Sequence, residues 1–126
     1  MINLTTGAAV SIFPTLSSYP LSKLVVLQIQ AYVAAENPNV TAVAVHPGVL
    51  MTDMTIDAFK RFALDTAELV GGVSVWLATD RVAFLTGKYI SANWSVDELI
   101  QRKNGITCEG KLSIALVGKF GSEQFA

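Results

Sequence analysis

Residues 17–45 have the sequence SSYPLSKLVVLQIQAYVAAENPNVTAVAV, and this stretch decides the fold. From Ser17 or Ser18 to about Glu36, apolar residues recur at helical spacing. The segment 37–39, Asn-Pro-Asn, ends that pattern. Residues 40–45 are then a nearly continuous apolar run, which is typical of a parallel strand buried on both faces. The stretch therefore predicts a helix followed by a buried strand, the repeating unit of a parallel α/β sheet.

The predicted helix is apolar around more than one face. Its main stripe, interrupted by one polar residue (Gln28), consists of Leu21, Leu24, Val25, Ile29 and Tyr32. Val26, Leu27 and Val33 widen the apolar arc, so we expect the helix to contact something besides its own sheet. Pro20 lies in the first turn, where a missing backbone N–H costs nothing.

Further elements are predicted on both sides of this unit. Residues 2–5 are expected to form a short buried strand, residues 88–91 a third strand, and residues 66–78 a second long helix. We expect residues 51–63 to form a partly helical connection. Ser95 is a good N-cap for a short helix ending near residue 103. The tail, residues 110–126, is expected to be irregular or to add one short strand. The predicted order of elements along the chain is strand, helix, strand, helix, strand. This order predicts an α/β class fold with a small parallel sheet, whose first strand has a bare edge.

Composition excludes several classes of function. The net charge of the 126 residues is −1, which argues against a nucleic-acid partner. No apolar run reaches the roughly 18 residues that span a bilayer, and no signal peptide is visible, so we expect no membrane partner and a cytoplasmic location. Cys108 is the single cysteine, so an internal disulfide and a multi-cysteine metal site are excluded, and no metal is expected. Apolar residues make up 52% and charged residues only 15%, which favours either a compact domain or a piece of a larger body.

Tyr19 and Lys23 carry the first chemical signal. A helix places residues four apart on one face. A phenol with a pKa of about 10 is a poor acid–base group near neutrality, and an adjacent ammonium group stabilises its phenolate. The spacing therefore predicts a proton donor and acceptor. By itself the pair is weak evidence for catalysis, because a tyrosine in the first turn of a helix usually packs against other side chains. An exposed lysine is usually a solvated surface charge.

Two more motifs accompany the pair. Thr6 is a hydroxyl residue thirteen positions before Tyr19, at the end of the first predicted strand. Residues 47–52, Pro-Gly-Val-Leu-Met-Thr, follow the next predicted strand. Each of these has an ordinary structural interpretation, as a strand residue or a turn. The three together, in this order and on these elements, indicate a specific active site. His46 precedes the turn and is interpreted as a strand-end residue without an obvious acid partner.

The ordered motifs resemble the short-chain dehydrogenase/reductase family, in the C-terminal half of its shorter branch. The resemblance extends from residue 1 to about residue 94 and includes Thr-Gly-Lys-Tyr-Ile-Ser-Ala-Asn-Trp at residues 86–94, a form similar to fungal members. It implies the C-terminal half of a Rossmann-like, doubly wound parallel sheet in residues 1–94, followed by a short helix and extension in residues 95–126. It also implies an NAD(P)-dependent oxidoreductase acting on a small-molecule carbonyl or alcohol, with a homo-oligomer expected.

The resemblance implies roles for individual residues. Tyr19 would be the general acid in reduction and the base in oxidation. Lys23 would hold the nicotinamide ribose hydroxyls and lower the pKa of Tyr19, and Thr6 would orient the substrate carbonyl where the family usually has serine. The cofactor, NAD or NADP, would contact Tyr19, Lys23, Pro47, Gly48, Val49 and Thr52.

The chain departs from the family in one large respect. No Gly-rich phosphate loop occurs anywhere in it, and the residues that choose between NAD and NADP belong to the other half. Two interpretations therefore stay open. The chain is either a truncated reductase, inactive alone, or a non-catalytic protein that kept this half as an association module. Residues 51–63 are expected to cover an apolar pocket, but the sequence does not identify a substrate.

Overall fold

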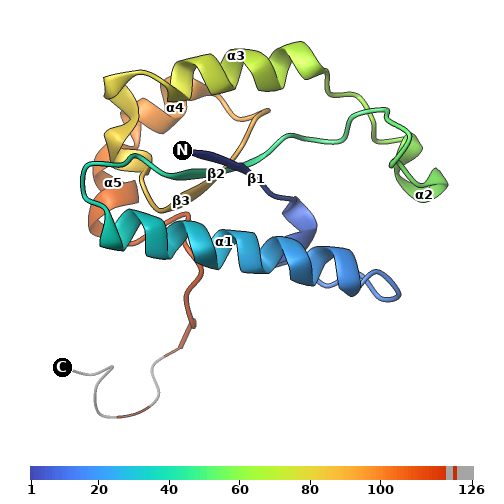
Figure 1. Ribbon diagram of the computed structural model, residues 1–126, viewed down its shortest axis with the longest axis horizontal. Helices are drawn as coiled ribbons and strands as arrows, with labels where there is room; N and C mark the ends of the chain where they lie inside the picture. The colour runs from blue at the N-terminus through green and yellow to red at the C-terminus, as the bar shows by residue number, and fades with distance from the viewer. Residues whose placement is uncertain (119–120, 122–126) are drawn as a thin grey trace.

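The computed structural model describes residues 1–118 and 121, and it shows a three-layer α/β arrangement (Figure 1). A parallel sheet of three strands has the order β1 (Ile2–Leu4), β2 (Val43–His46), β3 (Lys88–Ser91). Helix α1 (Ser18–Glu36) lies along one face of the sheet and helix α3 (Ala67–Leu77) along the other. The predicted fold class is therefore confirmed.

The register of the sheet brings its carboxyl ends to one side. Ile2 pairs with Val43, and Val43 pairs with Lys88, all in parallel. In Figure 1 the strands end on the side where α1 starts and where α2 (Asp57–Lys60) lies. Ligands of open parallel sheets bind at this end.

The core lies on the α3 side of the sheet. Central strand β2 is buried along almost its whole length, as its apolar run predicts. The buried cluster joins β2 and β3 to α3, to the 3-10 helix η2 (Asp80–Leu85), and to α4 (Val96–Gln101) and α5 (Lys103–Cys108). Its largest fully buried members are Val43, Val45, Val82, Leu85 and Ile90.

The prediction that the first strand is buried is wrong. Ile2 and Leu4 are exposed, because β1 is an edge strand and the buried cluster includes residues of β2 and β3 but none of β1. The main apolar stripe of α1 faces outward: it includes four residues that are each more than half exposed, Leu21, Val25, Ile29 and Tyr32. Leu27 and Gln30 are the buried residues of this helix, and the Gln30 amide donates to the Lys88 carbonyl oxygen at 3.0 Å.

Helix ends agree closely with the sequence signals. Asn37 caps the end of α1, Thr66 caps the start of α3, and the Ser95 hydroxyl accepts from the Glu98 N–H at 3.3 Å. The predicted helix after Ser95 is two helices, because α4 ends at Gln101 and α5 begins at Lys103. Residues 110–118 form no strand, and the rest of the predicted tail, apart from residue 121, lies outside the described residues.

Candidate active site

Lys23 joins α1 to the end of β1. Its ammonium Nζ donates to the Leu4 carbonyl oxygen at 3.2 Å. The Thr5 hydroxyl donates to the Lys23 carbonyl oxygen, also at 3.2 Å, so the helix and the strand are bonded in both directions. These two bonds fix the second turn of α1 against the carboxyl end of the sheet.

Tyr19 lies one turn before Lys23 on the same helix face. The Lys23 Nζ is 6.0 Å from the centroid of the Tyr19 ring. The ring is 48% exposed, so it is open to a ligand approaching from solvent. The structure thus brings these two residues together as their spacing predicts.

Thr6 follows β1 and begins a short 3-10 helix, η1 (Gly7–Val10). Its hydroxyl oxygen accepts from the Ala8 N–H at 3.3 Å. A hydroxyl has one hydrogen to donate and two lone pairs, so this bond leaves the O–H free to donate to a substrate oxygen.

The Pro47-Gly48 turn follows β2 beside Thr6. The Thr5 N–H donates to the Val45 carbonyl oxygen at 2.9 Å, which aligns the ends of β1 and β2. A Cβ atom placed on Gly7 would lie 3.5 Å from the imidazole of His46, the residue before Pro47. The hydroxyl segment and the turn are therefore neighbours in space, although forty residues separate them.

Thr52 is held inside a threonine pair beyond the turn. Its N–H donates to the Thr55 hydroxyl at 3.0 Å, and the Thr55 hydroxyl donates to the Leu50 carbonyl oxygen at 2.6 Å. Thr52 itself is exposed. Its hydroxyl lies 3.2 Å from that of Thr55 and can still bond an incoming polar group.

His46 has an acid neighbour that sequence reasoning missed. Burial lowers the pKa of the His46 imidazole below its ordinary value of 6.5, and the charge of Asp65 opposes that shift. Among the described residues, the buried Nδ1 of His46 has no hydrogen-bond partner. The interpretation of His46 from the sequence did not include this nearby charge, because nineteen positions separate the two residues.

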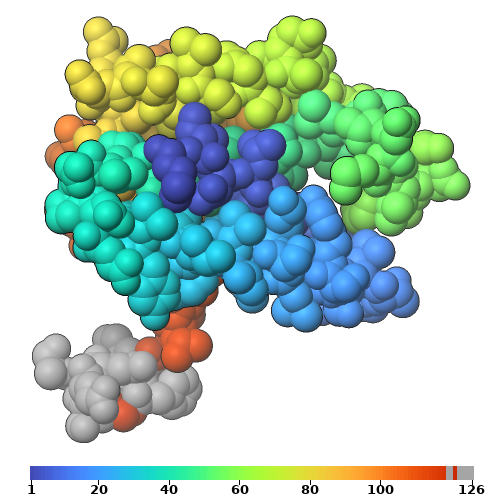
Figure 2. Space-filling view, in the orientation of Figure 1, coloured from blue at the N-terminus to red at the C-terminus, as the bar shows by residue number. Residues whose placement is uncertain are grey.

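The end of the molecule that carries these residues is hollowed. Figure 2 shows an open gap between the green connection that follows β2 and the blue segment at the start of α1. The two sides touch where the rings of Phe13 and Phe59 meet edge to face, with centroids 6.0 Å apart. The connection carries exposed apolar side chains on this side of the sheet, among them Met51 and Met54.

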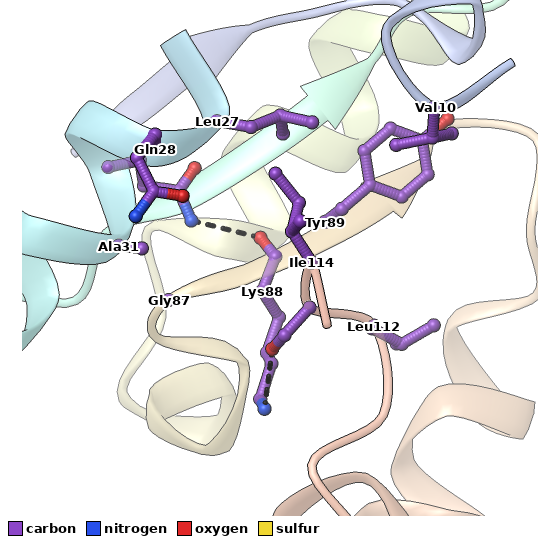
Figure 3. A pocket seen from close by; sticks show the side chains of 11 residues that line it. Val10, Leu27, Gln28, Ala31, Gly87, Lys88, Tyr89, Leu112 and Ile114 are labelled. Atoms are coloured by element: carbon purple, nitrogen blue, oxygen red, sulfur yellow. Dashed lines mark hydrogen bonds between the residues drawn. The ribbon is translucent and has the colours of Figure 1, made fainter. Parts of the chain in front are cut away.

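A separate cavity of about 350 Å³ lies between α1, β3 and the segment after α5 (Figure 3). Its lining includes Leu27, Gln30, Tyr89 and Leu112, and none of the seven predicted site residues. On one wall of the cavity the Gln30 amide donates to the Lys88 carbonyl oxygen at 3.0 Å. The cavity is thus distinct from the end of the sheet where the motifs converge.

The donor set at the carboxyl ends suits a nicotinamide ribose and a carbonyl oxygen. It comprises an exposed phenol (Tyr19), an anchored ammonium (Lys23), a hydroxyl (Thr6) and a glycine turn (Gly48). Among the described residues, no cluster of three or more potential ligands could hold a metal ion. The fold and this set define a class of protein: parallel α/β proteins with a phenol, an ammonium group and a hydroxyl near the carboxyl ends of their strands.

Comparison with known proteins identifies the family within this class. The chain is 33% identical to a short chain dehydrogenase of Monascus purpureus over 122 residues, a match covering 93% of this chain and 42% of the relative. It is 32% identical to a short chain dehydrogenase/reductase of Claviceps purpurea over 124 residues, with the same two coverages. No model of a known protein family matches. The chain belongs to the short-chain dehydrogenase/reductase family, and it spans about 42% of the length of these curated relatives.

A solved structure supports the fold. A putative oxidoreductase from Escherichia coli superposes with a TM-score of 0.58 at 22% sequence identity, over 71% of this chain and 38% of that one. At this identity the likeness concerns the fold alone. It agrees with the Rossmann-like arrangement that the family resemblance implies.

Proposed function

We propose that this chain supplies the catalytic half of an NAD(P)-dependent oxidoreductase that reduces a carbonyl group or oxidises the corresponding alcohol. The observation that carries the proposal is the bond from Lys23 Nζ to the Leu4 carbonyl oxygen. That bond places the Tyr19–Lys23 pair at the carboxyl end of the sheet, beside Thr6 and the Pro47-Gly48 turn. Family membership supports a nicotinamide cofactor.

Each residue has a task that its position supports. The Tyr19 phenol gives its proton to the substrate oxygen in reduction and takes it back in oxidation. The Lys23 ammonium, pinned at one side by Leu4, presents its other N–H donors to the ribose hydroxyls. The Thr6 O–H donates to the substrate oxygen. A bound nicotinamide supplies the hydride, and the chain supplies position and charge.

Cofactor binding also needs groups that the chain does not contain. Dinucleotide sites of this fold hold the pyrophosphate at a Gly-rich turn and a helix N-terminus. No such turn occurs in the sequence. We therefore infer that the chain alone binds neither NAD nor NADP with useful affinity.

The test is to complete the chain with the portion of the Monascus purpureus relative that lies outside the match. This hybrid, called the completed protein below, should oxidise NADH or NADPH in the presence of a panel of ketones and aldehydes. Calorimetry should show cofactor binding to the completed protein and none to the 126-residue chain. A folded completed protein without cofactor binding would overturn the proposal, and micromolar binding by the chain alone would reveal a phosphate site elsewhere.

The second candidate function is a non-catalytic association module. The exposed apolar stripe of α1 favours it, since large exposed apolar patches mark interaction surfaces. It predicts association of the chain without any cofactor. The two functions separate cleanly, because only the first predicts hydride transfer by the completed protein.

A further inference from the structure

Asp65 bonds the Gly48 turn at two points, across a gap of sixteen residues. Its carboxylate Oδ2 accepts from the Val49 N–H at 2.7 Å. Its own backbone N–H donates to the Val49 carbonyl oxygen at 3.2 Å. A bond from an N–H to a carboxylate is among the stronger hydrogen bonds of proteins. The turn after β2 is thus fastened to the residue that leads into α3.

The carboxylate occupies the space that a side chain at position 48 would need. A Cβ atom placed on Gly48 would lie 2.2 Å from Asp65 Oδ2 and 2.4 Å from its Cγ. Gly48 also has φ +86°, a left-handed conformation that L side chains rarely adopt. The glycine is therefore required twice, by its backbone angle and by the close approach of Asp65.

Asp65 is not engaged in capping α3. That task falls to Thr66, whose hydroxyl accepts from the Leu69 N–H at 3.3 Å. A half-buried carboxylate next to the start of a helix is usually stabilised by the helix dipole and the free N–H groups of the first turn. Here its hydrogen bond goes to the Val49 N–H of the turn instead.

We propose that Asp65 is a positioning residue that holds the Pro47-Gly48-Val49 turn in the shape that receives the nicotinamide. The proposal rests on the proposed function for the identity of the ligand. The same two bonds close residues 50–64 into a loop with both ends fixed. Asp65 also brings its charge near enough to the His46 imidazole to oppose the lowering of the His46 pKa by burial.

The first test is hydrogen exchange at the Val49 amide of the 126-residue chain, followed by mass spectrometry with residue-level fragmentation, which tolerates association. Asp65→Ala should speed Val49 exchange by about ten-fold, the effect of losing one charge-assisted bond. Asp65→Asn keeps an acceptor oxygen and should restore most of the protection. Asp53→Ala, which removes an exposed carboxylate from the same connection, is the matched control and should change nothing. Equal Val49 exchange in the original chain and in Asp65→Ala would overturn the proposal.

The second test separates positioning from a merely structural role. In the completed protein, Asp65→Ala should raise the KM for the nicotinamide cofactor about ten-fold while leaving the KM for the carbonyl substrate unchanged. Asp65→Asn should recover the cofactor KM. If Asp65→Ala worsened the KM for cofactor and the KM for carbonyl substrate equally, and Asp65→Asn recovered neither, the positioning role would be overturned. If the completed protein with Asp65 unchanged binds no cofactor, the proposed function fails. The rate of Val49 exchange still decides in that case whether Asp65 holds the turn.

Discussion

At the scale of single residues, the sequence predicted which side chains matter better than how they are held. Tyr19, Lys23 and the Pro47-Gly48 turn were found from spacing, because helix geometry and strand ends make spacing informative. Their roles remain predictions. The contacts that hold the site, Leu4 to Lys23 and Asp65 to Val49, could not be predicted. Both join residues distant in sequence, and one uses a backbone carbonyl, which carries no sequence signal.

Lys23 should affect both cofactor binding and turnover. Its ammonium is held by the Leu4 carbonyl oxygen on one side and lies 6.0 Å from the Tyr19 ring on the other. In the completed protein, we expect Lys23→Ala to raise the cofactor KM and to lower kcat, each by about ten-fold or more. Steady-state kinetics measure both. Lys111→Ala, which breaks only a surface ion pair with Glu109, is the control. A change in kcat alone would remove the cofactor role assigned to Lys23.

The single histidine offers a pH measurement. Burial holds the pKa of His46 below 6.5 in the folded chain, although Asp65 acts in the opposite direction. As pH falls through 6.5, the unfolded chain takes up the proton first, so the free energy of unfolding should decrease in that range and below it. NMR titration of the only imidazole should give a pKa under 6.5. His46→Gln should remove this contribution to the pH dependence. A native pKa at or above 6.5 would contradict the buried placement of the ring.

At the scale of elements, the sequence predicted the existence of the strands and long helices but not which face of α1 is buried. The most apolar stripe of that helix is outside, while the buried face includes Gln30. Gln30 is tolerated there because its amide donates to the Lys88 carbonyl at the start of β3. Periodicity reports where apolar residues lie, and it cannot report which of two apolar faces the chain itself covers.

Helix caps allow a matched test at this scale. Ser95 accepts from the Glu98 N–H and starts α4, whereas Ser17 precedes α1 without a side-chain cap bond. We expect Ser95→Ala to lower the free energy of unfolding by about 1 kcal/mol. Ser17→Ala should change it by less than about 0.5 kcal/mol. Urea unfolding of the completed protein followed by circular dichroism compares the two. Equal losses would show that α4 does not depend on this cap.

At the scale of the whole molecule, the described part of the chain is a core with one open side. The sheet ends at β1, which has a partner on one edge only, and α1 turns its apolar stripe outward. The buried cluster lies on the α3 side. No helix in the described range is long and apolar enough to cross a bilayer. Relatives more than twice as long match over nearly the whole chain, which is consistent with cover supplied from elsewhere.

We therefore expect the 126-residue chain to associate when studied alone. Unpaired strand edges and exposed apolar patches both promote association. Light scattering on freshly purified chain should show dimers or larger species. Val25→Glu with Ile29→Glu, two changes on the exposed stripe, should shift the distribution toward smaller species. A monodisperse monomer with a sharp thermal transition would show that this half of the fold is self-sufficient.

The central claim is that Tyr19 is the acid–base group of a nicotinamide-dependent active site, and one comparison tests it most directly. Tyr19 and Tyr32 lie on the same helix and are 48% and 58% exposed, so replacing either by phenylalanine removes one hydroxyl from a similar environment. In the completed protein, Tyr19→Phe should lower kcat for carbonyl reduction by roughly 10²–10⁴-fold while the cofactor still binds, because only the transferable proton is lost. Tyr32→Phe should leave kcat unchanged. Equal kcat values for the two variants would contradict the account.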